Sequence, residues 1–436
     1  MTVYNLVSFL GVFVLAACAW LFSTDRKVVN WRVLAWGTGL MFLLALFVFV
    51  LPAGTRLFLW VNNAASAVLD TATAGTKFVF GRLALPPGAI NEAGETSLGY
   101  FLAFQGLPTI IFFAALLGGL YYLGIMSFIV RVFARVFTKL MRISGAEALS
   151  VSANIFVGVE SALVVRPHLK DMTRSEFCTI ITAGMGTIAS TVLAMYVMML
   201  QKQIPTIAGH LVSASFISAP ACIVMAKLIM PETENPLTLG VDVQPHYERE
   251  DNLIMAIING AWEGLRLLGG ILTLLIAFLG ILKLLNLGLG WGGGLLNGAF
   301  GWHVKWSLET LLGYVFYPFT LAMGVHPSDA LTVAKILGER TILTEVYSYQ
   351  HLADLLAGGG LHDPRSAIIA SYALCGFAHV ASLAIFVGGT SALVPSRVRD
   401  ISRLGFRALL AATLACLMTG AVAGTFYTGA SVLFGK

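Results

Sequence analysis

Charged residues are scarce in this chain. Asp, Glu, Lys and Arg together make up 11% of its 436 residues, while hydrophobic residues make up 58%. An ordinary soluble domain carries about 25% charged residues, so this chain has too few to cover a globular surface. A soluble enzyme and a nucleic-acid-binding protein are therefore excluded. The net charge of +5 agrees with this, because the basic residues sit in short loops between apolar segments.

Cysteine is equally sparse. The five cysteines are far apart, lie inside apolar segments and lack the spacing of a metal site; they are Cys18, Cys178, Cys222, Cys375 and Cys416. This pattern excludes a secreted disulfide scaffold and a zinc site, and it predicts small core residues. No nucleophile–base pair or cluster of metal ligands occurs at a recognisable spacing, so we expect neither an enzyme nor a resident cofactor.

Long apolar runs dominate what is present. Six runs are nearly free of charge, and they cover residues 6–22, 33–51, 100–130, 253–285, 367–393 and 408–434. About 20 apolar residues suffice to cross a bilayer as a helix, so the sequence predicts an all-α polytopic membrane protein. The first run is followed by Thr24, Asp25, Arg26 and Lys27, which is typical of a retained first span rather than of a cleaved signal.

Basic residues predict the orientation of the chain. They form four groups, which lie at 26–32, 131–142, 166–174 and 397–407. A single threading places all four groups in the cytoplasm, so the N- and C-termini are both expected outside, together with the segment 53–98. This threading has eight transmembrane helices, provided that the apolar stretches 148–165 and 330–349 do not cross.

These two stretches carry polar residues in their middle. The first contains Asn154 and Glu160, and the second contains Glu339 and Glu345. A carboxylate near mid-membrane on a lipid-facing helix costs at least about 2.5–3.5 kcal/mol. Both stretches are therefore predicted to be re-entrant helical hairpins that line a polar cavity, because non-helical backbone at that depth is tolerated only inside protein.

A short internal repeat follows the two hairpins. Residues 184–190 and 376–382 both fit Gly-x-x-(Thr/His)-(Ile/Val)-Ala-Ser within an otherwise apolar span. Glycines and small polar residues favour a helix that is broken at its centre. A hairpin followed by a broken helix, occurring twice, is typical of the inverted repeats of a secondary transporter. Each heptapeptide alone is equally typical of helix packing, but the pair favours a binding site.

At these residues the sequence resembles the concentrative nucleoside transporter family, of the bacterial, eight-span type. Residues 154–162 and their continuation to 176 resemble the family's Asn-Ile-Phe-Val-Gly-Gln-Thr-Glu-Ala-Pro, Arg-Pro-Tyr-Leu and Met-Thr-x-Ser-Glu stretches. Residues 338–345 resemble Gly-x-Lys-x-x-x-Asn-Glu-Phe, and 373–378 resemble Ala-Leu-Cys-Gly-Phe-Ala-Asn. Several ordered matches make this resemblance more specific than any one motif.

The resemblance implies an elevator-type homotrimer in the bacterial inner membrane, in contact with lipid and without a nucleic-acid partner. Its substrate is a nucleoside and its usual coupling ion is sodium. We expect N-terminal scaffold spans in 1–130 and a central scaffold span with a Gly-rich external loop, at residues 291–294, in 253–310. The mobile transport domain is expected in 131–252, with an interfacial helix and the first repeat, and in 311–436, with the second repeat.

Four residues are expected to bind sodium on the strength of this resemblance. Asn154 matches a side-chain ligand in the first hairpin, and Thr187 matches a hydroxyl ligand on the broken helix. The carbonyl groups of Val157 and Ile188 would complete a small oxygen cage. The alternative is that Asn154 caps a half-helix and Thr187 bonds back to its own helix.

The first hairpin is also expected to contact the substrate, through Gly158, Val159 and Glu160. Glu160 matches the family's hairpin glutamate if one residue is missing before it, since Gly158-Val159-Glu160 stands where the family has Gly-Gln-Thr-Glu. In an alternative alignment Glu160 takes the Thr position and Ser161 the Glu position. We prefer the alignment that matches Glu160 to the family's glutamate, because a buried carboxylate rarely persists without a role. In both alignments polar groups that contact the base are absent.

The second hairpin supplies Glu345, which matches a glutamate that holds ribose hydroxyls; a structural ion pair with Arg340 or Lys335 is the alternative. A carboxylate that accepts from a vicinal diol makes charge-assisted hydrogen bonds, which are about twice as strong as neutral ones. Glu345 is therefore the residue on which recognition of the sugar is expected to depend.

His379 departs from the family, which has an asparagine facing the sugar at this position. An unperturbed imidazole titrates at about pH 6.5, so we expect substrate binding to change between about pH 5.5 and 8. A packed helix residue is the alternative. Ser382 and Phe377 match residues at the sugar and on the pocket wall, and Val192 is expected to line the same pocket.

Three functions compete at this point. The first is import of nucleosides by sodium symport. The second is transport of a modified nucleoside or nucleoside-like compound, with a proton as the alternative coupling ion. The third is a non-transporting membrane receptor or gate-like protein, and the joint retention of Asn154, Thr187, Glu160 and Glu345 argues against it.

Overall fold

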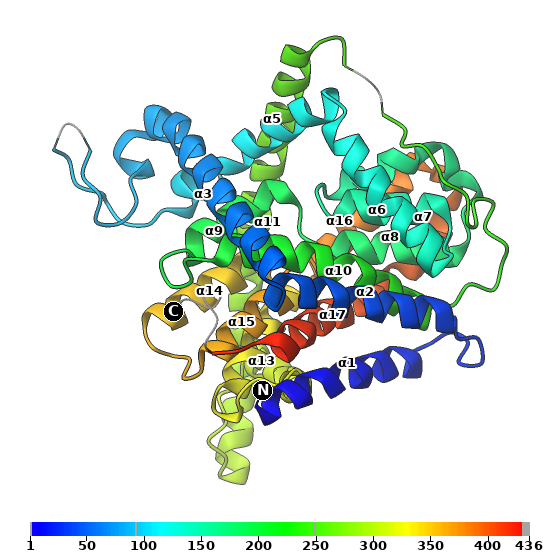
Figure 1. The fold of residues 1–436 in the computed structure, drawn as a ribbon. Helices are drawn as coiled ribbons and strands as arrows, with labels where there is room; N and C mark the ends of the chain where they lie inside the picture. Colours follow the sequence, from blue (N-terminus) through cyan, green and yellow to red (C-terminus); the bar gives the residue numbers. More distant parts are fainter. Residues whose placement is uncertain (1, 92–93, 248–249, 430–436) are drawn as a thin grey trace.

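The computed structural model describes residues 2–91, 94–247 and 250–429, without the side chains of Val159 and Glu160. Within these ranges the protein is built of helices and contains no β-strand (Figure 1). The all-helical architecture of the described residues confirms the predicted fold class at this level.

Apolar helices of membrane-spanning length make up much of the chain. Among the described residues, seven segments are long and apolar enough to cross a membrane: Val3–Leu21, Trp31–Phe49, Leu102–Tyr122, Arg174–Leu200, Ile207–Ile229, Leu253–Phe300 and Pro395–Phe426. The predicted run 367–393 is not among them, because a break divides it into two shorter helices. Residues 430–434 of the last predicted run lie outside the described part.

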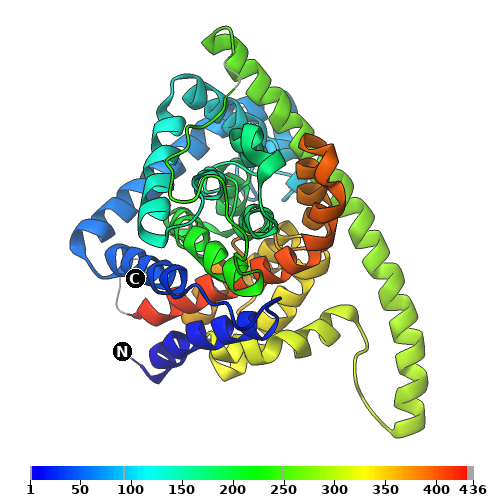
Figure 2. The ribbon, with the colours of Figure 1, turned by 90° about the vertical axis from the view of Figure 1, so that its right-hand side faces the viewer.

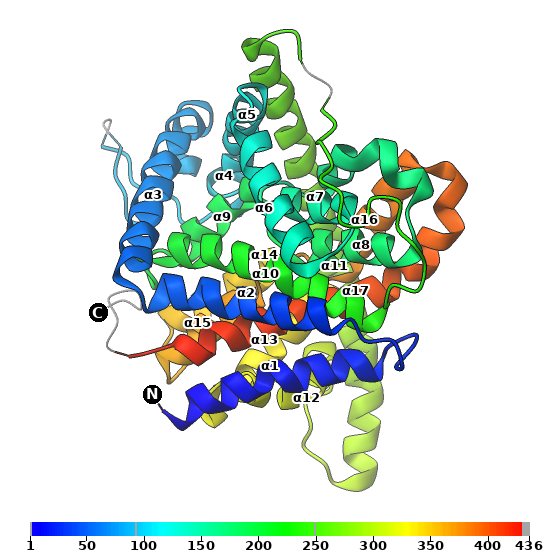
Figure 3. The ribbon, with the colours of Figure 1, turned by 45° about the vertical axis from the view of Figure 1, so that its right-hand side comes forward.

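The two N-terminal helices pack against two helices from later in the chain (Figure 3). The four helices are α1 (Val3–Leu21), α2 (Trp31–Phe49), α10 (Ile207–Ile229) and α17 (Val398–Phe426). Buried polar contacts reinforce this packing, since the Asn5 side chain donates to the carbonyl oxygen of Thr425 at 2.9 Å. The Arg365 guanidinium donates to the Ser8 hydroxyl at 2.6 Å. The N-terminal helices are therefore tied to the C-terminal part of the fold.

The segment 53–98, which was predicted to be external, contains a long helix that the sequence analysis missed, α3 (Pro52–Phe80). Its buried residues recur at helical spacing and form one stripe, and Phe58 packs at the position where Gly209 of α10 leaves room. The short η1 (Gly81–Ala84) and α4 (Leu102–Gln105) follow. A single apolar stripe among polar residues does not resemble a span, which explains why the helix was overlooked.

A second packed pair stands beside this assembly, formed by α5 (Thr109–Tyr122) and α11 (Leu253–Phe300). Figure 2 shows α11 as a long rod along one side of the molecule. A Cβ atom on Gly118 of α5 or on Gly260 of α11 would lie 2.5 Å from a carbonyl oxygen of the other helix. Small residues thus allow the two backbones to approach closely, as in other membrane helix pairs.

The predicted Gly-rich loop at residues 291–294 is wrong, because these residues continue α11. Each internal glycine costs a helix only about 1 kcal/mol. In an apolar environment an interrupted helix costs more, since its free backbone groups find no water. Trp306 of the returning chain packs at Gly293, where a Cβ atom would lie 2.0 Å from the indole.

The first repeat contains the predicted hairpin and broken helix. Its elements are α6 (Ile125–Met141), α7 (Gly145–Asn154), η2 (Val159–Asp171), α8 (Arg174–Gly186) and α9 (Ser190–Leu200). The predicted end of the hairpin at Arg166-Pro167 is wrong, because the 3₁₀ helix η2 continues through Pro167 to Asp171. Proline fixes φ at about −65°, which a 3₁₀ helix accepts. The predicted break lies at residues 187–189.

The second repeat has the same order of elements. It comprises α12 (Leu308–Ala322), α13 (Pro327–Ile342), α14 (Glu345–Ala357), α15 (Pro364–Ala373), α16 (Val380–Leu393) and the short η3 (Pro395–Arg397) before α17. Helices α13 and α14 form the second hairpin, and residues 374–379 form the second break. The two breaks and the two hairpin tips are the irregular backbone from which the site is built.

Candidate functional site

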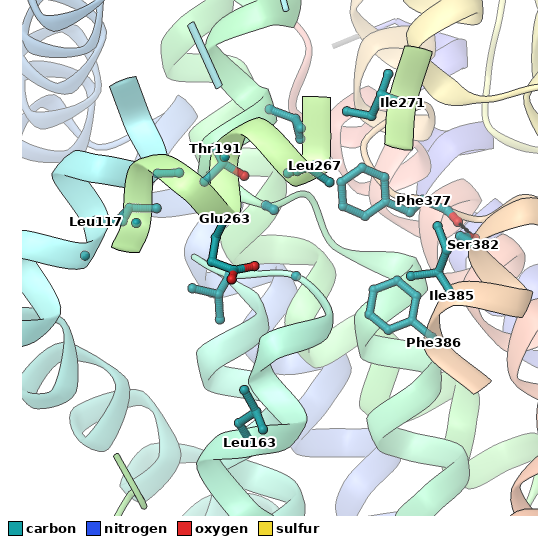
Figure 4. A pocket seen from close by; sticks show the side chains of 18 of the residues that line it. Leu117, Leu163, Thr191, Glu263, Leu267, Ile271, Phe377, Ser382, Ile385 and Phe386 are labelled. Atoms are coloured by element: carbon teal, nitrogen blue, oxygen red, sulfur yellow. Dashed lines mark hydrogen bonds between the residues drawn. The ribbon is translucent and has the colours of Figure 1, made fainter. Parts of the chain in front are cut away.

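A cavity of about 430 Å³ lies where both repeats meet the α5–α11 pair (Figure 4). The hairpin tips, α9 and α16 form one part of its wall, and α5 and α11 form the other. Figure 4 shows Leu117 and Glu263 on one side and Phe377, Ser382 and Phe386 on the other. The wall is largely apolar with a few polar groups, which is typical of a small-molecule pocket.

Glu345 is the most deeply buried carboxylate of this cavity, with 3% of its surface exposed. One carboxylate oxygen, Oε1, accepts a hydrogen bond of 2.7 Å from the Tyr196 hydroxyl. The other, Oε2, lies 2.9 Å from His379 Nε2. Within the described part of the chain no ion pair joins Glu345 to Arg340 or Lys335, so the alternative of a structural pair finds no support there.

His379 is fixed by the helix that it caps. It precedes the first residue of α16, and its Nδ1 accepts a hydrogen bond of 3.1 Å from the backbone N–H of Ser382. A backbone N–H can only donate, so Nδ1 carries no proton in this arrangement. The proton of the neutral ring is therefore on Nε2, the nitrogen that faces Glu345.

Three helix N-termini surround the cavity. Helices α9, α14 and α16 begin at Ser190, Glu345 and Val380, and residues of their first turns line the wall. The N-terminus of a helix carries a partial positive charge. The cavity thus combines one buried carboxylate with the positive ends of three half-helices, which suits a polar, uncharged ligand with both donors and acceptors.

Tyr196 was missed by the sequence analysis. Its side chain is fully buried, and its ring stacks on Tyr349 with the ring centres 4.5 Å apart. Tyr349 in turn donates to the carbonyl oxygen of Ser371 at 2.8 Å. The available signal was a lone hydroxyl within the apolar run of α9, because a buried tyrosine usually needs a hydrogen-bond partner.

The first break meets the tip of the first hairpin. The Thr187 hydroxyl lies 2.9 Å from the carbonyl oxygen of Asn154 and 2.8 Å from that of Ala183. The backbone N–H of Ser190 donates to the carbonyl oxygen of Phe156 at 3.0 Å. The contact with Ala183 is the helical back-bond foreseen as the alternative for Thr187, and the contact with Asn154 joins the hairpin to the broken helix.

The residues at this junction fit a small hard cation. Asn154 is fully buried, and its amide nitrogen donates to the carbonyl oxygen of Ser150 at 3.2 Å. Its amide oxygen has no hydrogen-bond partner among the described residues. A buried acceptor without a partner is costly, and a neutral oxygen is a ligand that hard cations prefer. The hydroxyl oxygen of Thr187 and the carbonyl oxygen of Ile188 lie in the same break.

The two breaks touch each other. Gly376 in the second break has φ +156°, and a Cβ atom there would lie 2.9 Å from the carbonyl oxygen of Gly186, which ends α8. It would also lie 2.6 Å from the sulfur of Cys416. Only glycine satisfies both the backbone angle and the space, so the repeats are joined at their irregular centres.

The predicted site residues whose side chains the structure describes fall into two groups. Seven of them line the cavity: Val157, Gly158, Val192, Glu345, Phe377, His379 and Ser382. Asn154, Thr187 and Ile188 are buried behind it, at the first break. Val159 and Glu160 belong to η2 by their backbone, but their side chains lie outside the described part of the chain.

Glu263 of α11 also lines the cavity and was not foreseen. Its carboxylate forms an ion pair with Arg266 of the same helix, and Figure 4 shows it on the wall opposite Phe377. The signal available in the sequence was an acid within an apolar helix, which usually marks a function. Glu263 brings a charged group from α11 to a cavity whose buried carboxylate comes from the second repeat.

Comparisons with known families cover most of the chain. Residues 10–83 match the family described as sodium-dependent nucleoside transporter N-terminus, and residues 210–424 match the one described as sodium-dependent nucleoside transporter C-terminus. Residues 103–203 match a family described as nucleoside recognition. Transporter YutK of Bacillus subtilis is 37% identical over 96% of this chain and 98% of its own length. The chain belongs to the sodium-dependent nucleoside transporter family.

A mammalian relative in the sodium-dependent nucleoside transporter family is longer than this chain. Solute carrier family 28 member 3 of Homo sapiens is 38% identical over 96% of the chain, and the chain spans 60% of its length. Among solved structures, the transporter CNTnw in an inward-facing, substrate-bound state is 34% identical. It superimposes with a TM-score of 0.85 over 97% of this chain and 98% of its own. The family assignment and the all-helical architecture therefore agree.

Proposed function

We propose that this chain is a secondary active transporter that imports nucleosides across the bacterial inner membrane by sodium symport. One observation carries the proposal: the cavity places a buried carboxylate among three half-helix N-termini, directly beside a break that leaves a buried amide oxygen without a partner. A nucleoside offers ribose hydroxyls to the carboxylate and an uncharged base to the apolar wall. No step of this function makes or breaks a covalent bond, so the protein acts as a carrier.

Glu345 is the proposed anchor of the ribose. A sugar hydroxyl that donates to this carboxylate makes a charge-assisted hydrogen bond. Phe377 and Val192 present apolar surface for the base, and Ser382 presents a hydroxyl in the first turn of α16. Val159 cannot donate or accept through its side chain, so recognition of the base rests on fewer polar groups than in the family motif.

Asn154, Thr187, Val157 and Ile188 are the proposed ligands of the sodium ion. The ion would satisfy the amide oxygen of Asn154 and join the hairpin tip to the broken helix. Because the same hairpin supplies Gly158 to the cavity, ordering of the tip by the ion also prepares the substrate site. Sodium and nucleoside are then carried together.

The packing suggests how the parts move. Helices α5 and α11 face the cavity from outside the repeats, so we infer that they belong to the fixed scaffold. Helices α1 and α2 pack against α10 and α17, and Asn5 of α1 donates to a carbonyl oxygen of α17, so we infer that they travel with the repeats. The fixed part is then smaller than the predicted scaffold of residues 1–130. An elevator movement of the repeats past α5 and α11 would carry the cavity across the membrane.

The cavity is proposed to open toward the cytoplasm in this conformation. His246 and Tyr247 lie on its wall and belong to the linker after α10, which the distribution of basic residues assigns to the cytoplasm. With eight crossings, counting α15 and α16 as one broken span, both termini are outside. We further propose that the transporter is a homotrimer.

A second candidate is transport of a modified nucleoside or a nucleoside-like compound, with a proton as the alternative coupling ion. The observation that favours it is His379, whose Nε2 lies 2.9 Å from Glu345 where the family motif has asparagine. An ordinary ribose must compete with this imidazole for the carboxylate. A substrate that lacks one ribose hydroxyl would not.

Uptake into proteoliposomes tests the proposal. We expect radiolabelled uridine or adenosine to accumulate when sodium is outside and not when choline replaces it. Accumulation that ignores sodium but follows a proton gradient would overturn the choice of ion. Failure of a panel of nucleosides and nucleoside analogues to accumulate under either gradient would overturn the transport function itself.

The variant Asn154→Ala tests the ion site within the same assay. It removes the unpaired amide oxygen, so we expect the sodium concentration for half-maximal uptake to rise roughly tenfold or more, as expected for the loss of one strong ligand. The matched control is Asn62→Ala, which removes a buried asparagine of α3 that accepts from Gly209 N–H. Equal sodium dependence in the two variants would contradict the assignment.

A further inference from the structure

Arg340 is a fully buried arginine that the proposed transport cycle does not use. It lies in α13, two residues before the hairpin tip, with 0% of its surface exposed. Its Nη1 donates to the carbonyl oxygen of Ala373, the last residue of α15, at 2.6 Å. Its Nε and Nη2 have no hydrogen-bond partner, and it forms no ion pair among the residues that the structure describes.

A buried guanidinium without a carboxylate is expensive to keep. The loss of hydration costs several kcal/mol for an ion in a protein interior, and a nearby opposite charge normally offsets it. Here the groups that face the guanidinium are the neutral Cys416 thiol and the C-terminal end of a half-helix. Such an end carries a partial negative charge and carbonyl groups without helical partners.

The second break therefore resembles the first in one respect. In the first repeat, the hairpin tip at Asn154 meets the broken helix at Thr187, and a cation is the proposed occupant. In the second repeat, the hairpin near its tip meets the broken helix at Ala373, and a positive charge is already present on Arg340. Both junctions join a hairpin to backbone oxygens that the break has freed.

We propose that Arg340 is a fixed internal cation that holds the second break in place, as a sodium ion is proposed to hold the first. The comparison with sodium rests on the proposed function. Arg340 does not line the cavity, but the break that it holds carries Phe377 and His379, which do. Arg340 is thus a positioning residue for the substrate side of the site, and its charge is the property that matters.

Three variants separate charge from size and hydrogen bonding. Arg340→Lys keeps the charge, and lysine stands at this position in the motif Gly-x-Lys-x-x-x-Asn-Glu-Phe. Arg340→Gln keeps a donor for the Ala373 carbonyl oxygen without the charge. Arg340→Ala removes both and leaves room for a small molecule. Each full-length variant is reconstituted for uridine uptake, and its folding is checked by gel filtration and by melting temperature.

We expect Arg340→Lys to transport uridine with a KM close to that of the wild type. Arg340→Gln should raise the KM by about tenfold or more, as for the loss of a charged partner. The sodium-dependent rise in melting temperature, measured without nucleoside, should be unchanged in both, because the first break is intact. A Gln variant with the wild-type KM would overturn the proposal.

Chemical rescue distinguishes a role of the charge from a role in filling space, because only a charged molecule can replace the charge. Millimolar guanidinium should restore uridine uptake or the melting temperature of Arg340→Ala, whereas urea, which has a similar shape and no charge, should not. Equal rescue by urea, or none by either, would overturn the proposal. If the wild type takes up no nucleoside, the proposed function fails by that result alone, and rescue of the melting temperature still decides the role of Arg340.

Discussion

At the scale of single residues, the unusual feature is that each carboxylate oxygen of Glu345 already has a polar neighbour within the protein. Tyr196 and His379 each lie within 2.9 Å of one of its carboxylate oxygens. A ribose hydroxyl that approaches either oxygen must share it with its present neighbour or displace that neighbour. His379 is the natural candidate, because the resemblance places a shorter asparagine at its position.

His379→Asn should free Oε2 of Glu345 for the sugar. Asparagine is a favourable N-cap, so the start of α16 should remain intact. One charge-assisted hydrogen bond is worth about 1.5–3 kcal/mol, so the preference for uridine over 2′,3′-dideoxyuridine should grow roughly 10- to 150-fold. Competition binding with the two compounds measures it.

The control for this experiment is His379→Ala, which loses the cap as well and should cost about 0.5–2 kcal/mol of stability.

A second proton on His379 could be placed only on Nδ1, where it would oppose the N–H of Ser382. Protonation therefore breaks the cap, and the pH dependence expected from the sequence should be absent in His379→Asn. The same discrimination and the same pH profile in wild type and His379→Asn would show that His379 only packs.

The sequence could predict which residues reach the site, but not how they pair. Glu345, His379 and Ser382 were found because polar residues stand out in apolar sequence and because their positions match motifs of the family that the sequence resembles. The partnership of Glu345 with Tyr196 depends on the distance between α9 and α14, which no local pattern encodes. Glu263 was missed for the same reason, since its place on the wall depends on how α11 packs against α5.

At the scale of elements, the breaks are the part of the fold that tolerates least change. Gly376→Ala places a methyl group against the Gly186 carbonyl oxygen and the Cys416 sulfur at a backbone angle that disfavours any side chain. Such overpacking costs about 1–3 kcal/mol. The free energy of unfolding, or the melting temperature in detergent, should fall accordingly, together with uptake.

Gly388→Ala is the matched control, because it lies in α16 and a Cβ atom there meets nothing within 4 Å. Alanine in a helix is favoured over glycine by about 1 kcal/mol, so this variant should be neutral or slightly more stable. If both alanines have the same effect, the contact between the breaks does not constrain the fold.

Hairpins and breaks could be predicted because both leave a strong local signal, polar or glycine residues at an interval in apolar sequence. The boundaries of α11 could not, because its glycines resemble a loop and only the surrounding apolar medium makes them helical. Helix α3 was missed for the opposite reason. Its stripe of apolar residues is too diluted by polar ones to stand out as a span.

At the scale of the whole molecule, α11 is the least buried of the seven membrane-length segments found among the described residues. It is 48 residues long, and only 6% of its most apolar window is buried. At 1.5 Å per residue it extends about 70 Å, more than twice the hydrocarbon thickness of about 30 Å. In the proposed trimer, a second copy of the chain packs against this exposed surface of α11.

Leu284→Lys tests this proposed interface between subunits, since Leu284 is 69% exposed on α11. The wild type in mild detergent should have three times the chain mass of 46.6 kDa by native mass spectrometry, and the variant should dissociate. Leu43→Lys is the control, because Leu43 is 61% exposed on α2 and a lysine is equally unfavourable on that apolar surface. Dissociation in both, or in neither, would contradict a trimer built on this face of α11.

The contact between Gly186 and Gly376 has one more consequence. The end of the helix beside the proposed ion site and the loop that carries His379 into the proposed sugar site are in van der Waals contact. Neither ligand needs to touch the other, because a shift of one break moves its neighbour. Thermodynamic linkage then requires reciprocity: whatever factor the ion adds to the affinity for the nucleoside, the nucleoside must add to the affinity for the ion.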